Sequence, residues 1–160
     1  IIYRNYRKNL KIDEIILLRN YCREKSLKFL LANNIKLSIK LNLDGAYLPS
    51  FNKVFSHLSY RYKKSFLLLG SAHNLKEIRI KEKQNVSEVF LSSIFKNNTN
   101  FLGINQYNLL SRLTNKKTIA LGGVSKENIK LIKLTKSIGF AGISFFKSKK
   151  KAPKKGPFNK

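Results

Sequence analysis

The sequence lacks several features that mark particular classes of protein. It has one cysteine, Cys22, so an internal disulfide is excluded, and a reducing compartment such as the cytoplasm is expected. Cys22 lies among apolar positions of a predicted helix, which indicates a buried thiol. No apolar run approaches the roughly 18 residues needed to cross a bilayer, so we expect no membrane-spanning segment.

Methionine is also absent, and the sequence opens on the apolar letters IIYR, which run directly into charged residues. A secretory signal peptide would show a basic region first and then a longer apolar one. The opening instead has the pattern of a β-strand entered midway. We therefore expect the sequence to be a fragment whose first strand is missing.

Acidic residues are scarce. The sequence has 8 acidic and 33 basic residues, which gives a formal net charge of +25. Such a charge favours nucleic acid or an anionic membrane as a partner. Lysine, asparagine and isoleucine are all abundant and share A/T-rich codons, so base composition accounts for part of the excess. A basic nucleic-acid-binding domain stays as an alternative, although no aromatic-rich basic strand and no zinc-finger pattern is present.

The densest block of charge is the final stretch, KSKKKAPKKGPFNK. It contains proline and glycine and has no hydrophobic periodicity, so we predict a disordered basic tail over residues 148–160. An arm that contacts a phosphate backbone is the alternative. Hydrophobic residues make up 42% of the chain, which is enough for a sizeable core, and we assign residues 1–147 to one domain.

Strand and helix patterns alternate along this domain. Short apolar runs predict strands, and apolar residues recurring near a 3.6-residue period predict helices. Asp13 and Asn74 are residue types that cap helix starts. The expected strands are 1–4, 27–32, 45–48, 65–70, 87–93, 118–121 and 141–146, and the expected helical or amphipathic segments are 13–25, 35–42, 74–83, 104–113 and 126–137.

The predicted strands are short and apolar on both faces, which is typical of a parallel sheet covered by helices. A doubly wound sheet and most of an eight-stranded βα-barrel both fit. The missing front end favours the barrel, because seven visible strands and one lost strand make eight. The predicted fold class is therefore α/β, a TIM-type (βα)8 barrel that lacks its first strand.

In either fold a ligand binds beyond the carboxyl ends of the strands. The residues at these ends are rich in Asn and Ser and lack the His, Cys and carboxylate cluster of a metal site. Neutral donors of this kind suit a phosphorylated ligand. The candidates are Arg4, Asn33, Asn34, residues 49–52, 71–73 and 92–98, Gly122, Gly123 and residues 144–147.

A glycine pair, Gly122 and Gly123, follows the apolar run TIAL. Glycines there allow a sharp turn and expose two N–H groups with no side chain in the way. A following helix capped near Ser125 would add its positive amino-terminal end. The pair therefore predicts a phosphate cradle, with a tight turn that binds nothing as the alternative.

Four stretches resemble the thiamine phosphate synthase/TenI family in order and spacing: LLANNIKLSIKLNLDGAYLPS, LLLGSAHNLKE, VFLSSIF and IALGGVSKENI with GFAGIS. The family has an N-D pair after a strand, then D-G-V-H-L, G-x-S-x-H, G-P-x-F and A-I-G-G-I...N segments. The resemblance covers residues 1–147 and implies a βα-barrel. It also implies synthases that use Mg²⁺ to join an aminopyrimidine pyrophosphate to a thiazole phosphate, releasing pyrophosphate, or thiazole tautomerases of the TenI branch.

The resemblance assigns ligand-binding roles residue by residue. Gly122 and Gly123, with Ser125 beside them, match the glycine pair that holds the thiazole phosphate. Arg4 and Ser71 match an arginine and a serine near the pyrophosphate. The remaining candidates for the substrate site are Asn33, Asn34, His73 and Ser93.

Departures from the family pattern concern its metal site and its tautomerase histidine. Asn34 and Asn52 fall where the family has aspartates that bind Mg²⁺, and an amide is a neutral, weaker ligand. Ser93 stands where TenI proteins have a histidine, while His73 is at a helix start, where a structural role is commoner. An altered synthase, a TenI-like tautomerase and a non-catalytic binder of a phosphorylated ligand all stay open.

Overall fold

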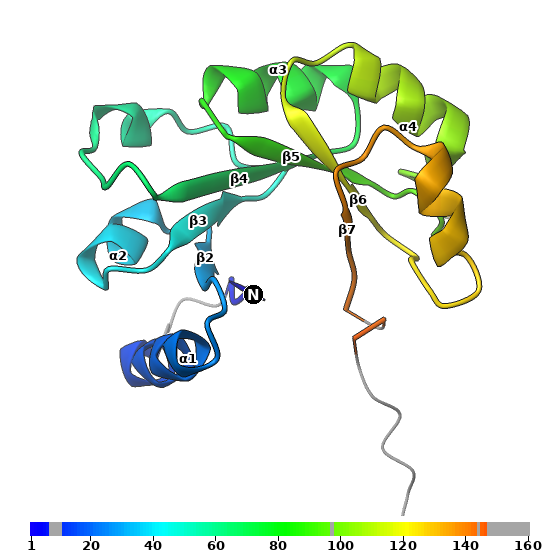
Figure 1. The fold of residues 1–160 in the computed structure, drawn as a ribbon. Coiled ribbons are helices and arrows are strands. Elements are labelled where there is room, and N and C mark those ends of the chain that lie inside the picture. Colours follow the sequence, from blue (N-terminus) through cyan, green and yellow to red (C-terminus); the bar gives the residue numbers. More distant parts are fainter. Residues whose placement is uncertain (7–10, 97, 144, 147–160) are drawn as a thin grey trace, which may run out of the picture.

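A computed structural model describes residues 1–6, 11–96, 98–143 and 145–146 (Figure 1). They form a seven-stranded sheet in the order β1 to β7, in which every neighbouring pair is parallel. This confirms the predicted alternation. The strands are β1 (Ile2–Tyr3), β2 (Leu30–Ala32), β3 (Gly45–Leu48), β4 (Leu67–Ala72), β5 (Glu88–Ser92), β6 (Lys117–Leu121) and β7 (Phe140–Ala141).

The sheet curls into an arch with β1 and β7 at its two ends (Figure 1). Among the described residues these two strands do not pair, so the structure is a curled half-barrel of the α/β class. The helices lie outside the arch. They are α1 (Ile12–Glu24), α2 (Ile35–Lys40), α3 (Leu75–Lys83) and α4 (Gly103–Arg112), with the 3-10 helices η1 (Ser56–Ser59) and η2 (Ile129–Leu134).

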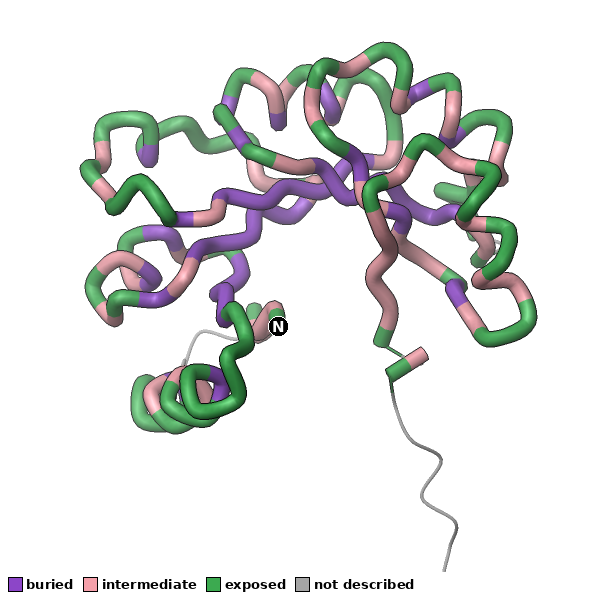
Figure 2. The backbone as a smooth tube through the Cα atoms, in the orientation of Figure 1, coloured by how far each residue is buried: buried purple, intermediate pink, exposed green. Residues whose placement is uncertain are grey.

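Side chains that alternate along the strands build two apolar layers, because successive residues of a strand point to opposite faces. The concave layer contains Leu30, Ala32, Tyr47, Leu69 and Phe90. The layer between sheet and helices is larger and includes residues of β3 to β6, α3 and α4. Figure 2 shows the burial concentrated in the central strands of the arch. The strand ends are thereby held rigidly in register.

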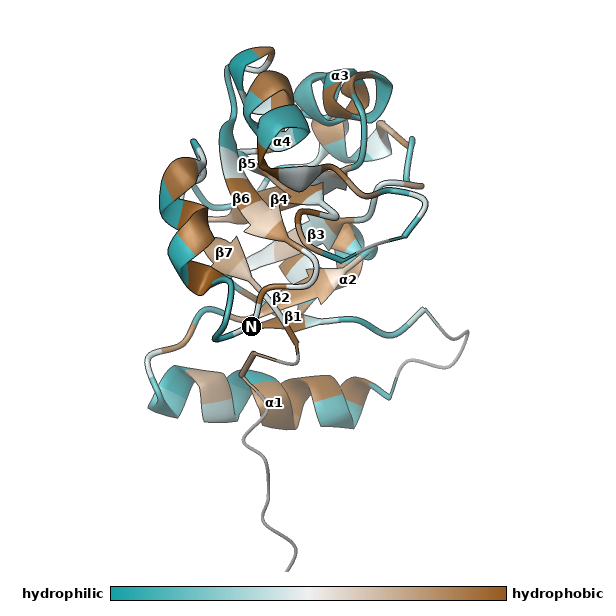
Figure 3. Ribbon diagram, turned by 90° about the vertical axis from the view of Figure 1, so that its right-hand side faces the viewer, coloured by the Kyte–Doolittle hydropathy of each residue, from teal (hydrophilic) through white to brown (hydrophobic). Residues whose placement is uncertain are grey.

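Helix α1 packs with β1, β2 and α2 through a separate cluster that includes Ile15, Cys22 and Leu31. Cys22 is buried, as the sequence predicted. In Figure 3, α1 lies beside β1 and β2 with apolar and polar residues interspersed along it. Within the part of the chain that the structure describes, no helix is long and apolar enough to cross a membrane.

Most expected boundaries shift by one to three residues, and three differences matter for the account. Helix α1 follows Lys11, and Asp13 lies in its first turn, where a carboxylate favours the helix dipole without acting as the cap. The segment expected as a helix over 126–137 forms only the 3-10 helix η2, which buries no residue. Strand β7 covers Phe140–Ala141 in place of 141–146. The predicted tail, 148–160, lies outside the described residues.

Candidate functional site

The carboxyl ends of the parallel strands meet along one rim of the arch, and the predicted site residues that follow lie there, whereas candidates 97, 144 and 147 lie outside the described residues. The sequence rule that selected them therefore holds for their placement. Their positions differ from strand to strand: Arg4 follows β1, Asn33 and Asn34 follow β2, Asn52 lies in the loop after β3, Ser71 is in β4 with His73 just beyond it, Ser93 follows β5, and Gly122 and Gly123 follow β6.

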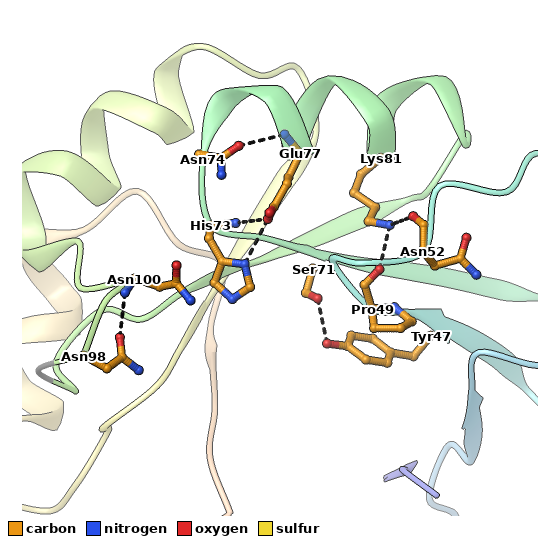
Figure 4. A network of polar contacts seen from close by, with 10 residues as sticks. All are labelled: Tyr47, Pro49, Asn52, Ser71, His73, Asn74, Glu77, Lys81, Asn98 and Asn100. Atoms are coloured by element: carbon orange, nitrogen blue, oxygen red, sulfur yellow. Dashed lines mark hydrogen bonds and ion pairs between the residues drawn. The ribbon is translucent and has the colours of Figure 1, made fainter. Parts of the chain in front are cut away.

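A buried hydroxyl pair lies on the concave face. The Tyr47 hydroxyl donates to Oγ of Ser71 over 2.8 Å, linking β3 to β4 (Figure 4). The Arg4 guanidinium lies 5.9 Å from the centre of the Tyr47 ring and 5.7 Å from that of Tyr6, whose hydroxyl accepts from its Nε. The structure thus brings Arg4 and Ser71 together through Tyr47.

Tyr47 keeps its proton in this setting. Burial raises the pKa of its hydroxyl, and the hydrogen bond with Ser71 and the charge of Arg4 oppose that rise. A protonated Tyr47 is a hydrogen-bond donor close to a fixed cation. Sequence reasoning missed it, although it stands at the histidine of the family's D-G-V-H-L segment, a polar position pointing into the arch.

The three asparagines form a second group, around the ends of β2 and β3. Asn34 caps α2 by accepting from the Leu37 N–H over 3.0 Å. The Asn52 Nδ2 donates to Oδ1 of Asn33 over 2.7 Å, and Asn33 adopts a φ of 60°. A cleft of about 310 Å³ opens beside these residues, lined also by Lys36, His57 and Tyr60.

This group does not fit a magnesium ion. Mg²⁺ binds through anionic oxygens and water, whereas all three side chains here are neutral amides. Their Oδ1 atoms already accept hydrogen bonds: Asn34 from Leu37, Asn33 from Asn52, and Asn52 from the N–H of Val54. Within the described ranges, no group of three or more His, Cys, Asp or Glu residues could hold a metal.

The glycine turn after β6 has the conformation that the sequence predicted. Gly122 and Gly123 have φ values of 100° and 76°, in the left-handed region that favours glycine. A Cβ on Gly123 would lie 2.4 Å from the backbone nitrogen of Lys96. The Gly122 carbonyl accepts from the N–H of Phe95. The glycines therefore let this turn close onto the loop that follows β5.

The Gly123 N–H donates to none of the described residues, so it is available to a ligand at the rim. The helix predicted to begin near Ser125 is absent from this place. The side chain of Asn128 instead accepts from the Ser125 N–H and donates to the Gly123 carbonyl, each over 2.8 Å. These bonds hold a turn over residues 125–128, in which the Ser125 carbonyl accepts from the Ile129 N–H over 2.9 Å, and η2 begins at Ile129.

The regular helix expected over 126–137 is therefore not formed, and the N-cap position of η2 is Asn128 in place of Ser125. Asn128 was missed in its place. An Asn three residues after a Ser, beyond a glycine pair, is a typical turn signal and could have identified it.

Ser93 and His73 make contacts inside the protein. The Ser93 hydroxyl is buried and donates to the Lys96 carbonyl over 3.0 Å, beneath Gly122. The His73 Nδ1 lies 2.9 Å from Oε2 of Glu77, which also accepts from the His73 N–H. Both arrangements stabilise loops at the rim. Asn74 caps α3, as predicted, by accepting from the Glu77 N–H.

A larger cleft of about 520 Å³ lies at the opposite end of the sheet, where α4 ends and β6 begins. Arg79, Arg112 and Lys116 line it, but so does Glu82, which Arg79 and Thr114 bind. The negative end of the α4 dipole also faces this region. The cleft lies at the amino ends of the strands, away from the rim that carries the predicted residues.

A family model described as thiamine monophosphate synthase matches residues 1–146. A protein of Aquifex aeolicus named "Putative thiamine-phosphate synthase 2" is 29% identical over 147 residues, which cover 87% of this chain and 78% of that protein. A thiamine-phosphate synthase of Methanococcus vannielii is 31% identical over 83 residues, 49% of this chain and 40% of the relative.

Among solved structures, the thiamine phosphate pyrophosphorylase of Pyrococcus furiosus superposes with a TM-score of 0.70 at 19% identity. The match covers 86% of this chain and 70% of that chain. At this level of identity the likeness concerns the fold, and it agrees with the curled parallel sheet described above.

Proposed function

We propose a function from one premise: the chain belongs to the thiamine monophosphate synthase family. On this premise it binds a thiazole phosphate and an aminopyrimidine pyrophosphate at the rim of the arch. It joins the two with release of pyrophosphate. The observation that carries this proposal is the position on one rim of two separate anion-binding groups, the glycine turn and the cluster around Arg4. A reaction between two phosphorylated substrates needs two such groups.

The glycine turn is proposed to hold the thiazole phosphate. Its backbone conformation exposes the Gly123 N–H, and the absence of a Cβ lets a phosphate oxygen approach closely. Backbone donors held by the contacts with the loop after β5 are already oriented, so little ordering is needed on binding. The turn would therefore fix the position of the nucleophilic substrate.

Arg4, Tyr47 and Ser71 are proposed to bind the pyrophosphate. The guanidinium supplies a positive charge that is retained at all ordinary pH values, and it is held over the Tyr47 ring. The Tyr47 and Ser71 hydroxyls reach the concave face as a hydrogen-bonded pair. Negative charge that develops on the departing pyrophosphate is stabilised by such pre-oriented donors.

Magnesium has no assigned step in this proposal, because the asparagine group does not suit it. The positive charge near the leaving group comes from Arg4 in this proposal. Closure of the half-barrel into a TIM-type barrel by a further strand, and a cytoplasmic location, belong to the same proposal.

The second candidate function for the same site is that of a TenI-like protein, which binds the phosphorylated ligand without joining two substrates. A tautomerase needs a group that moves a proton, and the Ser93 hydroxyl at the corresponding position is buried and donates to Lys96. The residues on the rim therefore favour the synthase over the tautomerase.

The test is pyrophosphate release in the presence of both substrates, followed together with the formation of thiamine phosphate. We expect release that requires both substrates and falls at least about tenfold in Arg4→Ala, because a charged hydrogen-bond donor is lost. The control is Lys11→Ala, which also removes one positive charge, but at an exposed position outside the site. Binding of both substrates with no release would show a binding protein, and binding of neither would overturn the proposal.

A further inference from the structure

Lys81 on α3 is fully buried, which is rare for a lysine. Its Nζ donates to the carbonyls of Pro49 and Asn52 over 2.8 Å each (Figure 4). It also donates to Oε1 of Gln84 over 2.9 Å. The stem lies against Gly70 of β4, where a Cβ would stand 2.9 Å from the Lys81 Cδ. The missing side chain at Gly70 therefore makes room for the lysine.

Gln84 is equally buried and reaches the same loop. Its Nε2 donates to the carbonyl of Asn52 over 3.2 Å, to Oδ1 of Asn52 over 3.1 Å and to the carbonyl of Val54 over 2.9 Å. Together Lys81 and Gln84 form a clamp, and the loop it holds is residues 49–54. This loop follows β3, whereas the clamp comes from the last turn of α3 and the residue after it.

The clamp fixes the orientation of one predicted site residue. With Oδ1 of Asn52 accepting from Gln84 and from the Val54 N–H, its Nδ2 is left to donate to Asn33 at the end of β2. A continuous set of contacts thus connects α3 to the ends of β3 and β2. Without the clamp, the exposed Phe51, Val54 and Phe55 would leave this loop with few buried anchors.

Burying an ammonium group is costly, and these three acceptors are all neutral oxygens. Burial accordingly lowers the pKa of Lys81 to about 8, with Glu77 one turn earlier acting in the opposite direction. A leucine or methionine would fill the same space on β4 at lower cost. The polar clamp therefore has a purpose beyond packing.

We propose that Lys81 and Gln84 are positioning residues that hold loop 49–54 and orient Asn52 toward the rim, where the second hydrogen of its Nδ2, beside the one donated to Asn33, serves the pyrophosphate that Arg4 binds. The part concerning the substrate rests on the proposed function. The part concerning the loop stands on the six hydrogen bonds alone. Neither residue touches the ligand itself, because both side chains lie beneath the loop.

The loop is tested first, without any ligand. Val54 is exposed and Cys22 is buried, so Val54→Cys accepts a spin label selectively. We expect Lys81→Met to increase the mobility of this label by about twofold or more, since charged hydrogen bonds are lost. Two controls should show no change in mobility. One is Lys83→Met, which replaces an exposed lysine of the same helix, read at position 54. The other is Lys81→Met read with a label on Leu17→Cys, at another exposed position. Unchanged mobility at position 54 in Lys81→Met would overturn the proposal.

The substrate is tested with inorganic pyrophosphate as the probe and thiazole phosphate as the internal control. We expect Lys81→Met to weaken pyrophosphate binding by about tenfold and to leave thiazole phosphate binding unchanged. In an Asn52→Ala background the effect of Lys81→Met on pyrophosphate should disappear. Equal weakening of both ligands, or an effect that persists without the Asn52 side chain, would indicate general destabilisation and overturn the positioning role.

Two safeguards keep the result decisive. If Lys81→Met does not fold, Gln84→Leu removes four of the six bonds and no charge, and it must give the same pattern in both tests. If the parent protein binds no pyrophosphate, the proposed function fails there, and the spin label alone decides on the clamp.

Discussion

The two sides of the rim differ in how their polar groups are used. At the ends of β2 and β3, the amide oxygens of Asn33, Asn34 and Asn52 accept hydrogen bonds within the protein, and Lys81 and Gln84 fix the loop from below. At the end of β6, the glycine turn leaves the Gly123 N–H without a partner among the described residues. On the first side the acceptor oxygens are occupied, whereas the second side is open to a ligand.

This difference indicates which ligand the chain binds best. A site whose donors are pre-oriented and unpaired gains hydrogen bonds on binding, whereas a site with satisfied groups must break some first. The glycine turn therefore suits a monophosphate. The asparagine side would need new charges to hold a metal–pyrophosphate complex. Four predictions test this contrast, beginning with the largest expected effect.

The largest effect is expected at Gly123. Gly123→Val places a β-branched side chain at a φ of 76° and 2.4 Å from the Lys96 nitrogen, so we expect the free energy of unfolding to fall by about 3 kcal/mol or more. Denaturant unfolding measures this, with Gly139→Ala as the control because nothing lies within 4 Å of its Cβ. Equal stabilities of the two variants would mean that the turn does not close onto the loop after β5.

The second prediction concerns the pH dependence of stability that Lys81 introduces. Its pKa in the folded protein is about 8, against an ordinary value of 10.5. Between these values the unfolded chain binds a proton that the folded chain has lost, so the free energy of unfolding should rise with pH.

The rise should total about 3 kcal/mol at 1.36 kcal/mol per pKa unit, and stability should no longer change with pH through Lys81 below pH 8, where the cost of the buried ammonium is fully present. The measurement is the difference between parent and Lys81→Met in denaturant unfolding from pH 7 to 10.5. A difference that stays constant over that range would show that Lys81 is not held in a costly buried state.

The third prediction uses the metal site. Asn34→Asp combined with Asn52→Asp adds two anionic oxygens, so Mg²⁺ should strengthen pyrophosphate binding by about tenfold in the double variant and little in the parent. Asn34→Asp preserves the cap of α2, because Asp is an equally good capping residue. Calorimetric titrations with and without Mg²⁺ give the comparison. Strong Mg²⁺ dependence in the parent would replace the proposal with a metal-dependent synthase.

The smallest effect is expected at His73. Its contact with Glu77 is partly exposed, so His73→Gln should lower the free energy of unfolding by less than about 1 kcal/mol. Pyrophosphate release should be retained, since the histidine serves the start of α3. A loss of release by more than tenfold, in a variant of nearly parental stability, would make His73 a catalytic residue.

Much of the fold was predictable from local patterns. The short apolar runs SFLLLG and TIAL predict strands that overlap β4 and β6 in the interior of the sheet, and Asn74 caps α3 as its residue type suggests. What failed is the segment after Gly123. Its spacing is helical, but Asn128 binds Ser125 and Gly123 through its side chain, and such a bond has no periodic signature in the sequence.

The candidate site was predictable in its location and less so in its contacts. The rule that ligands bind at the carboxyl ends of parallel strands selected Arg4, Ser71 and the glycine pair, and all of these lie on the rim. It missed Lys81 and Gln84, because a lysine on a helix normally faces solvent. Their burial depends on Gly70 in a neighbouring strand and on the carbonyls of a loop that lies 32 and 29 residues away in the chain.

The decisive measurement is a titration of ¹⁵N-glycine-labelled protein followed by amide chemical shifts. The chain has 8 glycines, so each signal can be assigned by substitution, as with Gly139→Ala. Thiazole phosphate should shift the signals of Gly122 and Gly123 and leave Gly45 and Gly70 in place, and the thiazole without its phosphate should shift neither pair. Saturable binding of thiazole phosphate with no change at Gly122 and Gly123 would contradict the assignment of the glycine turn as the phosphate site.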